Sequence, residues 1–188
     1  MKQKAHYNPK STKQIISLII MLVVSVAVVF GSIAIKNAVD KKNNESVDVG
    51  FTIAKTIPAT VQENELGITG VEKAFDSQNN VVAYVIKGTT TGYNAEAPIE
   101  MATTITADGK VVCGIDIIKQ EETEYLGVRI ATDDFKNQFT DKKLPVSSSN
   151  SIEKGSKIDV IAKSTISSQA VIDGVDNAAE YVKTFLVE

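Results

Sequence analysis

An uninterrupted apolar segment near the N-terminus contrasts with the mixed pattern of the rest of the chain. Between Lys13 and Lys36 the sequence reads QIISLIIMLVVSVAVVFGSIAI and contains no charged residue. Roughly 20 apolar residues allow a helix to cross a bilayer, so the pattern predicts a transmembrane anchor over residues 14–35. A cleaved signal peptide is the alternative, with Ser32 and Ala34 as small residues near a cleavage site. The apolar run exceeds the ~7–15 residues usual for a signal peptide, which favours the anchor.

Beyond a polar segment at residues 36–50, apolar and polar residues alternate in two stretches that are typical of β-hairpins. The first covers residues 71–88 and has a polar turn between its strands. The second covers residues 99–118 and contains Asp108-Gly109, a dipeptide favoured in tight turns. Together they predict an antiparallel sheet of about four strands, a size able to bury one face.

Helical periodicity appears in the last part of the chain. Apolar residues recur there at intervals of three and four and predict a helix over residues 167–187. This stripe consists of Val171, Val175, Ala178, Val182 and Phe185. A shorter helix is predicted over residues 132–139, with Thr132 as its cap. A loop rich in Ser, Pro and Gly is predicted over residues 144–157.

These elements predict an α+β fold, in which an antiparallel sheet packs with helices and is preceded by one N-terminal transmembrane helix. The predicted parts are a cytoplasmic N-terminus at residues 1–13, the anchor at 14–35, a linker at 36–50 and an extracytoplasmic domain at 51–188.

Charge orients this anchor and limits the chemistry of the outer domain. Four lysines and no acidic residue precede the anchor, whereas the remainder holds 16 basic and 23 acidic residues. Basic flanks stay in the cytoplasm, so the acidic bulk is expected outside. The absence of a basic patch disfavours nucleic-acid binding. The sequence contains one histidine, His6, and one cysteine, Cys113. The outer domain is therefore expected to hold no metal site, and we identify no catalytic residue in it.

Hydroxyl side chains crowd the start of the final helix. Thr165, Ser167 and Ser168 lie within the stretch DVIAKSTISSQAV. A Ser or Thr at such a place ordinarily caps the helix by accepting a hydrogen bond from one of its first amides. The same place suits a phosphate, because free N–H groups and the positive end of the helix dipole point there. The spacing alone leaves both interpretations open.

The residues around this cluster resemble the flavin-attachment motif of the FMN-binding domain family. That motif reads Asp, two variable residues, Ser or Thr, Gly, Ala and Thr, and Asp159 and Thr165 keep its spacing here. Residues 91–130 resemble the family in a Gly-Tyr pair, a hairpin and a Glu-Thr-x-x-Leu-Gly stretch. Residues 135–139 resemble its short helix ending in Gln-Phe. The resemblance covers residues 71–180, in addition to the single N-terminal span.

The resemblance implies that a flavin transferase attaches FMN covalently to Thr165 through a phosphoester. It also implies a binding site around Thr165, with Lys163 as a charge partner for the phosphate and donors from the helix start. The implied donors are Ser164, Ile166, Ser167 and Ser168. The residues implied to line the ring pocket are Gly92, Tyr93, Glu122, Thr123, Leu126 and Gly127.

Within this family, the size and single anchor of the chain are most similar to the G subunits of Rnf complexes. These are related to the C subunit of Na⁺-translocating NADH:quinone reductase. The resemblance implies an electron-carrier subunit of an ion-translocating ferredoxin:NAD oxidoreductase, single-pass in the cell membrane, with its flavin domain extracytoplasmic. The implied partners are the other membrane subunits of an Rnf-type complex and the flavin transferase that matures the chain.

Two departures from the family pattern leave alternatives open. Ala162-Lys163-Ser164 lies where the family has Ser/Thr-Gly-Ala, and Glu124-Tyr125 lies where it has Pro-Gly. The sequence is therefore also compatible with an anchored binding or scaffold domain that has lost flavinylation. A stand-alone anchored flavoprotein is a further alternative. Tyr125 is expected either to offer an aromatic face near the flavin or to lie in a loop as an ordinary surface residue.

Overall fold

The computed structural model of this protein describes residues 47–187. The predicted cytoplasmic N-terminus, the anchor at residues 14–35 and most of the predicted linker lie outside the described residues. Within residues 47–187 no helix has the length and apolar character needed to cross a membrane.

The centre of the fold is an antiparallel sheet of six strands, in which each strand pairs with its neighbour in sequence. The strands are β1 (Lys55–Ala59), β2 (Ile68–Phe75), β3 (Val81–Thr90), β4 (Ile99–Thr106), β5 (Val111–Lys119) and β6 (Lys142–Lys143). Both predicted hairpins are confirmed, as β2–β3 and β4–β5. The sheet is larger than predicted because β1 and β6 extend its edges. These edge strands are mostly exposed or only two residues long, so neither shows the alternation that identifies a half-buried strand.

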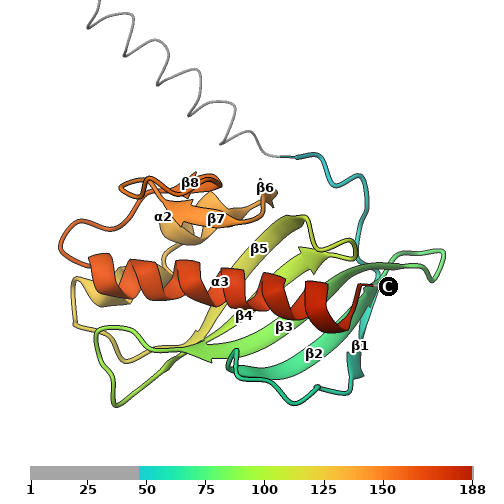
Figure 1. The fold of residues 1–188 in the computed structure, drawn as a ribbon, viewed down its shortest axis with the longest axis horizontal. Coiled ribbons are helices and arrows are strands. Elements are labelled where there is room, and N and C mark those ends of the chain that lie inside the picture. The colour runs from blue at the N-terminus through green and yellow to red at the C-terminus, as the bar shows by residue number, and fades with distance from the viewer. Residues whose placement is uncertain (1–46, 188) are drawn as a thin grey trace, which may run out of the picture. The chain divides into compact units, whose positions relative to one another are not determined.

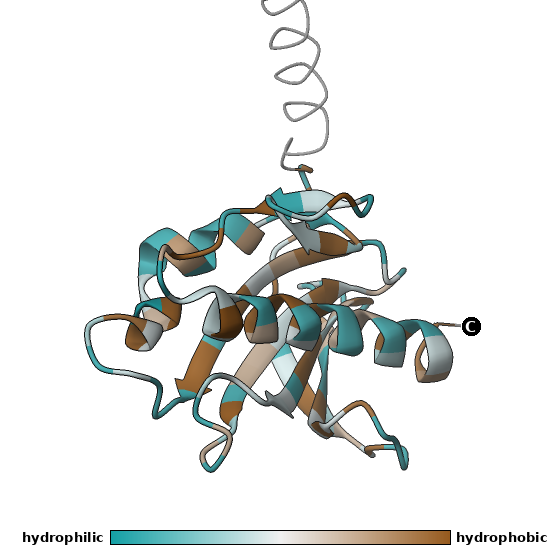
Figure 2. Cartoon of the chain, turned by 60° about the vertical axis from the view of Figure 1, so that its left-hand side comes forward, coloured by the Kyte–Doolittle hydropathy of each residue, from teal (hydrophilic) through white to brown (hydrophobic). Residues whose placement is uncertain are grey.

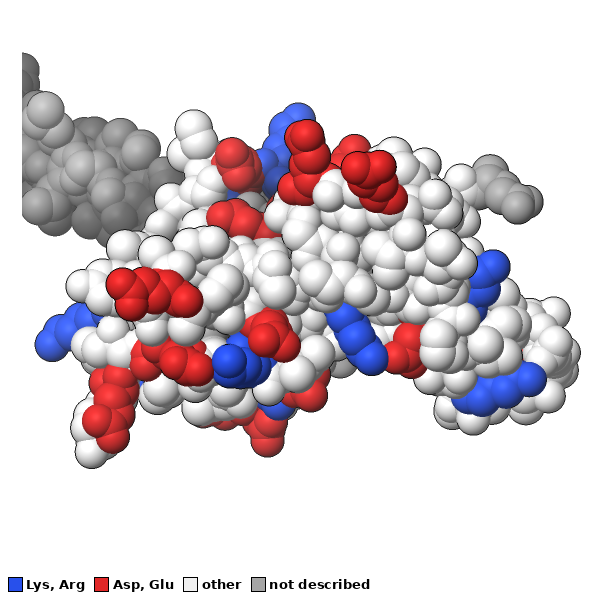
Figure 3. Space-filling model, turned by 90° about the horizontal axis from the view of Figure 1, so that it is seen from below, with Lys and Arg blue, Asp and Glu red and all other residues white. Residues whose placement is uncertain are grey.

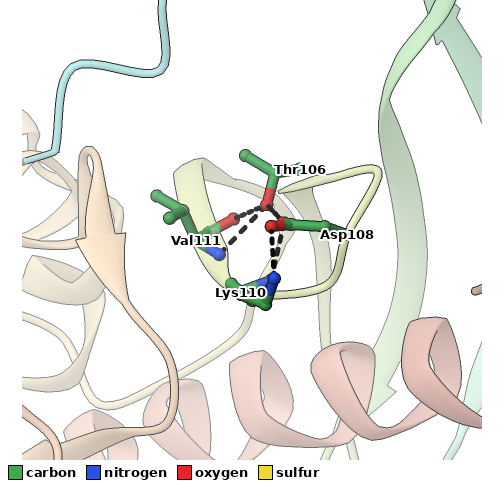
Figure 4. A network of polar contacts seen from close by, with 4 residues as sticks. All are labelled: Thr106, Asp108, Lys110 and Val111. Atoms are coloured by element: carbon green, nitrogen blue, oxygen red, sulfur yellow. Dashed lines mark hydrogen bonds and ion pairs between the residues drawn. The ribbon is translucent and has the colours of Figure 1, made fainter.

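The β4–β5 turn is held by a small polar network, drawn in Figure 4. The Thr106 hydroxyl donates to Asp108 Oδ1 at 2.6 Å and accepts from the Val111 N–H at 3.1 Å. Asp108 also accepts from the Lys110 N–H at 3.1 Å, while Gly109 adopts a φ of +69°. The hydrogen bond from Thr106 holds the pKa of the Asp108 carboxyl below its usual value. The predicted Asp-Gly turn is thus confirmed, and its side chains fix the register of β4 against β5.

Helix α3 (Thr165–Phe185) lies across one face of the sheet (Figure 1). Figure 2 shows apolar residues along the strands of the sheet and along α3. Four members of the predicted stripe are buried, but Phe185 is 41% exposed because it lies at the helix end. Its ring packs against that of Tyr181, with 4.8 Å between the ring centroids. The helix begins at Thr165, two residues before the predicted start. The first turn shows no apolar stripe because Thr165 and Ile166 face solvent.

Two apolar clusters fill the space between α3 and the sheet, and both include residues of α3. The first contains Ile99, Met101, Val112, Phe135, Phe139 and Val171, and the second contains Tyr84, Ile86, Ile105, Tyr181 and Val182. Gly174 lets the helix approach the sheet closely, because a Cβ there would lie 2.6 Å from the Met101 sulfur. Helix α3 therefore contributes side chains to both apolar clusters of the core.

The segment between the sheet and α3 departs from prediction in two places. The expected helix over residues 132–139 consists of α2 (Asp133–Lys136) and a 3-10 turn, η2 (Asn137–Phe139), preceded by η1 (Gly127–Ala131). Thr132 does not cap α2; its hydroxyl donates backward to the Arg129 carbonyl at 2.8 Å.

The expected loop at residues 144–157 contains β7 (Val146–Ser148) and the start of β8 (Ser156–Ile158), which pair in parallel. Three-residue strands are too short to show a strand pattern in sequence.

Candidate functional site

The start of α3 presents backbone amides that no side chain caps. Ser164 precedes the helix but makes no side-chain cap, and its carbonyl accepts the N–H of Ser168 at 3.0 Å. The amides of Thr165, Ile166 and Ser167 precede this first intrahelical bond and point out of the helix end. The capping interpretation of the hydroxyl cluster is therefore wrong for this structure. The uncapped end has the partial positive charge that attracts an anion.

Three serine hydroxyls near this helix end are buried and already donate hydrogen bonds within the fold. Ser164 Oγ donates to Ser167 Oγ at 3.2 Å, and Ser167 Oγ donates to Glu122 Oε2 at 2.6 Å. Ser168 Oγ donates to the Ser164 carbonyl at 2.9 Å. Each hydroxyl has one proton to give, so these three side chains are committed as donors. Of their backbone amides, those of Ser164 and Ser168 donate to the Ile161 and Ser164 carbonyls, so only the Ser167 amide remains as a donor for a ligand at the helix start.

Thr165 differs from these serines because its side chain is exposed. No other residue within 47–187 forms a hydrogen bond with its hydroxyl. Lys163, two residues earlier, is also exposed and adopts a left-handed backbone with a φ of +65°. This is the position where the family motif has glycine, the residue that adopts such a conformation freely. Lys163 thus keeps the backbone shape of a glycine while it adds a positive charge beside Thr165.

These residues border an open cleft of about 460 Å³, a volume within the range of small-molecule sites. One wall comes from the start of α3, and the other comes from the loop after β3 and the segment leading into η1. The cleft is lined by Tyr93, Thr123, Leu126, Gly127, Lys163, Ser164, Thr165, Ile166 and Ser167. All nine are among the residues that the sequence resemblance identifies.

Glu122 does not line the cleft, contrary to expectation, but lies behind its wall with only 6% of its surface exposed. Gly92 and Gly127 leave room for it. A Cβ on Gly92 would lie 2.2 Å from Glu122 Oε1, and a Cβ on Gly127 would lie 2.6 Å from the Glu122 Cβ. Gly92 likewise falls outside the lining, as does Ser168. These three predicted residues support the cleft from behind.

Sequence reasoning missed two residues that shape this region. Asn94 donates its backbone N–H to Glu122 Oε1 at 3.2 Å, and its side chain donates to the Glu121 carbonyl at 2.8 Å. Gln138 binds both backbone groups of Asp159, accepting from the N–H at 2.7 Å and donating to the carbonyl at 3.3 Å. Both residues form hydrogen bonds that involve backbone groups, and such bonds cannot be recognised from the pattern of side chains in a sequence.

Tyr125 is 82% exposed and adopts a φ of +63°, again where the family has glycine. It is not part of the cleft lining, although Thr123 and Leu126 on either side of it are. The structure therefore places the Tyr125 side chain in solvent at the cleft margin. Backbone strain of this kind clusters at functional sites.

The cleft suits a ligand that combines a phosphate with a flat ring. At its helix end it offers free amides, the Lys163 ammonium and an exposed hydroxyl, which match an anion. Its remaining wall is largely apolar, with Tyr93, Leu126 and Ile166 available to contact a ring. The donor set and the volume are thus consistent with a flavin mononucleotide.

Comparison with known proteins identifies the region. Residues 92–180 match the family of FMN-binding domains. Over 110 residues the chain is 38% identical to the G subunit of the ion-translocating oxidoreductase complex of Methanosarcina acetivorans, covering 58% of this chain and 56% of that protein. Over 135 residues it is 36% identical to the G subunit of the Na⁺-translocating ferredoxin:NAD⁺ oxidoreductase complex of Acetobacterium woodii, covering 65% and 63%. The chain thus spans roughly three fifths of the curated relatives that it matches.

Solved structures agree on the fold. The C subunit of the Na⁺-translocating NADH-quinone reductase from Parabacteroides distasonis superposes with a TM-score of 0.54 at 19% identity, covering 72% of this chain and 79% of that one. NqrC from Shewanella oneidensis gives a TM-score of 0.52 at 12% identity, covering 73% and 71%. These likenesses confirm the α+β architecture with its antiparallel sheet and C-terminal helix. Residues 92–180, which match the FMN-binding domain family, lie within this fold.

Proposed function

We propose that this chain is the electron-carrying G-type subunit of a membrane-bound, ion-translocating ferredoxin:NAD oxidoreductase of the Rnf kind, with FMN attached covalently to Thr165. The observation that supports this most directly is the state of the hydroxyls at the start of α3. Three of them are buried and committed as donors, whereas Thr165 is exposed in the cleft. The similarity to three G subunits supports the assignment to such a complex.

Attachment requires only the Thr165 oxygen and an activated flavin donor. In the proposed step, Thr165 Oγ1 displaces a nucleoside monophosphate from a flavin dinucleotide, with a flavin transferase as the catalyst. An O–P bond forms to the FMN phosphorus while the P–O bond of the pyrophosphate breaks. The threonine proton leaves to solvent or to the departing phosphate. No oxidant or reductant is consumed, and the product is a phosphoester.

The residues around Thr165 would then hold the attached group. The amides of Ile166 and Ser167 and the ammonium of Lys163 neutralise the phosphate charge. Tyr93 and Leu126 line the cleft and would shield one side of the ring from water. When bound, the flavin supplies electron transfer, while the protein supplies position and electrostatics.

The proposed setting is a single-pass membrane protein with residues 51–188 outside the cytoplasm. Its partners are the other membrane subunits of the complex, together with the flavin transferase during maturation. Covalent attachment suits this location, because a dissociated FMN would be lost outside the cell. A scaffold domain that has lost flavinylation is the alternative, and the observation that favours it is Ala162-Lys163-Ser164 in place of the family's Ser/Thr-Gly-Ala.

The deciding experiment is in-gel flavin fluorescence and intact mass of the denatured chain, purified from its native host. We expect a fluorescent band and a mass increased by one FMN less one water. Thr165→Val should abolish both signals. Thr184→Val, the same substitution at an exposed site near the other end of α3, should keep them. A dark wild-type band at the mass of the bare polypeptide would exclude the covalent flavin and favour the scaffold alternative.

A further inference from the structure

Glu122 is a buried carboxylate that the proposed attachment step does not use. It accepts three hydrogen bonds within the fold. Oε2 accepts from the Tyr93 N–H at 3.2 Å and from the Ser167 hydroxyl at 2.6 Å, while Oε1 accepts from the Asn94 N–H at 3.2 Å. A buried charge is costly unless such donors surround it. The two glycines that make room for Glu122 show that the backbone is shaped around this side chain.

The three donors come from the two opposite walls of the cleft. Tyr93 and Asn94 belong to the loop between β3 and β4, and Tyr93 is one of the lining residues. Ser167 belongs to the first turn of α3, beside Thr165. One carboxylate therefore joins the loop that presents Tyr93 to the helix start that presents the attachment hydroxyl.

The same carboxylate sets the direction of the serine hydrogen bonds. Because Glu122 is an acceptor, the Ser167 proton points toward it, and the Ser164 proton then points toward Ser167. Both protons are thereby turned into the protein. Thr165 is left as the hydroxyl that the helix start offers to the cleft.

We propose that Glu122 is a positioning residue for the flavin site: it fixes Tyr93 as a wall of the cleft and reserves Thr165 as the acceptor hydroxyl. The proposal deepens the proposed function and rests on it, because a fixed Tyr93 matters only to a ligand in the cleft. A glutamine at this position would not reproduce the arrangement. Its amide adds two N–H donors where Glu122 meets only donors, so at least one present hydrogen bond must break.

The first test is hydrogen–deuterium exchange of the Tyr93 and Asn94 amides in the full chain, produced without flavin transferase so that no FMN is attached. Hydrogen bonds to charged groups stabilise by enough that their loss should raise exchange about tenfold in Glu122→Gln. Glu121→Gln, the same change at the exposed neighbouring residue, should exchange like the wild type. Wild-type exchange rates in Glu122→Gln would overturn the proposal.

The second test measures the initial rate of FMN attachment to the same unmodified chain by a flavin transferase with a flavin dinucleotide. We expect Glu122→Gln to lower this rate about tenfold, in line with the loss of a charged hydrogen bond. Tyr93→Ala should lower it too, and the losses in the double variant should be less than additive, because part of the effect of Glu122 acts through Tyr93. Fully additive losses, or an unchanged rate in Glu122→Gln, would overturn the positioning role.

Ser167→Ala provides a second route if Glu122→Gln fails to fold. It removes one of the three donors while leaving the carboxylate in place, and it should accelerate exchange at Tyr93 and Asn94 less than Glu122→Gln does. Unaltered exchange in this variant would count against the proposal. The exchange measurement needs no flavin. If the wild-type chain is never flavinylated, the proposed function is refuted, but the exchange rates still show whether Glu122 fixes Tyr93 and Asn94.

Discussion

At the scale of single residues, Lys163 and Tyr125 adopt an unfavourable backbone conformation beside the cleft. Both adopt left-handed backbones, with φ values of +65° and +63°. An L-residue with a Cβ loses roughly 1–2 kcal/mol in this conformation. The other two non-glycine residues of this kind within residues 47–187 are Asn79 and Asp141, types that tolerate it better. Lys163 and Tyr125 are therefore unusual residue types for this backbone conformation, and both lie beside the cleft.

Lys163→Gly should raise the free energy of unfolding by about 1 kcal/mol, because glycine removes the Cβ strain. Lys163→Ala is the matched control, since it also removes the ammonium but keeps the Cβ. Urea denaturation of both variants separates the backbone effect from the loss of charge. Equal stability of the glycine and alanine variants would show that the left-handed conformation carries no strain.

Most of the cleft was predictable from sequence because its residues fall into two short motifs. The stretch from Lys163 to Ser167 and the Glu-Thr-x-x-Leu-Gly stretch supply eight of the nine lining residues, and Tyr93 supplies the ninth. The hydrogen bonds behind the cleft lining were not predictable from the sequence. The hydrogen bond between Ser167 and Glu122 joins residues 45 positions apart, and only the fold brings them together.

At the scale of elements, α3 is connected to the small parallel sheet through Asp176. The half-buried Asp176 accepts the Val146 N–H at 3.1 Å, which joins α3 to the start of β7. Burial raises the pKa of Asp176 to about 6 from 3.8; the hydrogen bond from Val146 opposes this rise, and the negative charge of Asp173 adds to it. The folded state thus binds a proton at Asp176 more tightly than the unfolded state does.

This linkage predicts a defined effect of Asp176→Asn. Between about pH 4 and pH 6 the folded wild type holds more protons at this site than the unfolded chain, so its stability falls as pH rises through that window. Asparagine keeps the acceptor for Val146 but does not titrate. The stability of the variant relative to wild type should therefore grow from pH 4 to pH 6 and then level off.

Urea denaturation across this pH range provides the measurement. Glu180→Gln, at an exposed site on the same helix, serves as the control and should show a difference that varies much less with pH. A constant difference between Asp176→Asn and wild type over the window would refute the raised pKa.

Element prediction succeeded where a local signal matched the fold. The Asp108-Gly109 turn and the alternation around it identified β4–β5, and the apolar stripe identified α3. A similar alternation identified β2–β3, whereas β1, β6, β7 and β8 depended on tertiary context. Edge strand β1 contains Pro58 and is mostly exposed, while β7 and β8 have three residues each, and β7 packs against α3. Such strands have no pattern of their own to detect.

At the scale of the whole molecule, the described residues form an α+β fold in which α3 packs on one face of the six-stranded sheet. The cleft lies at the N-terminal end of α3. Figure 3 shows Lys and Arg interspersed with Asp and Glu on one face, without a continuous basic surface there. The predicted anchor belongs to the other part of the chain, outside the described residues.

The anchor makes a prediction about the whole chain in its host. The full chain should remain in the membrane fraction after an alkaline wash, whereas a variant lacking residues 1–35 should be released while keeping the melting temperature of the domain. N-terminal sequencing of the mature chain distinguishes the anchor from a signal peptide. A mature chain that begins near residue 35 would establish cleavage instead of anchoring.

The left-handed backbones of Lys163 and Tyr125 also affect how related genes are recognised in genomes. A motif search that demands glycine at these two positions would pass over this chain, although its backbone there has the geometry that glycine allows. At both positions the loop of this chain has a positive φ, which a residue bulkier than glycine adopts here at an energetic penalty. Genome surveys that score these positions by permitted conformation rather than by residue identity should therefore recover additional chains with the same site.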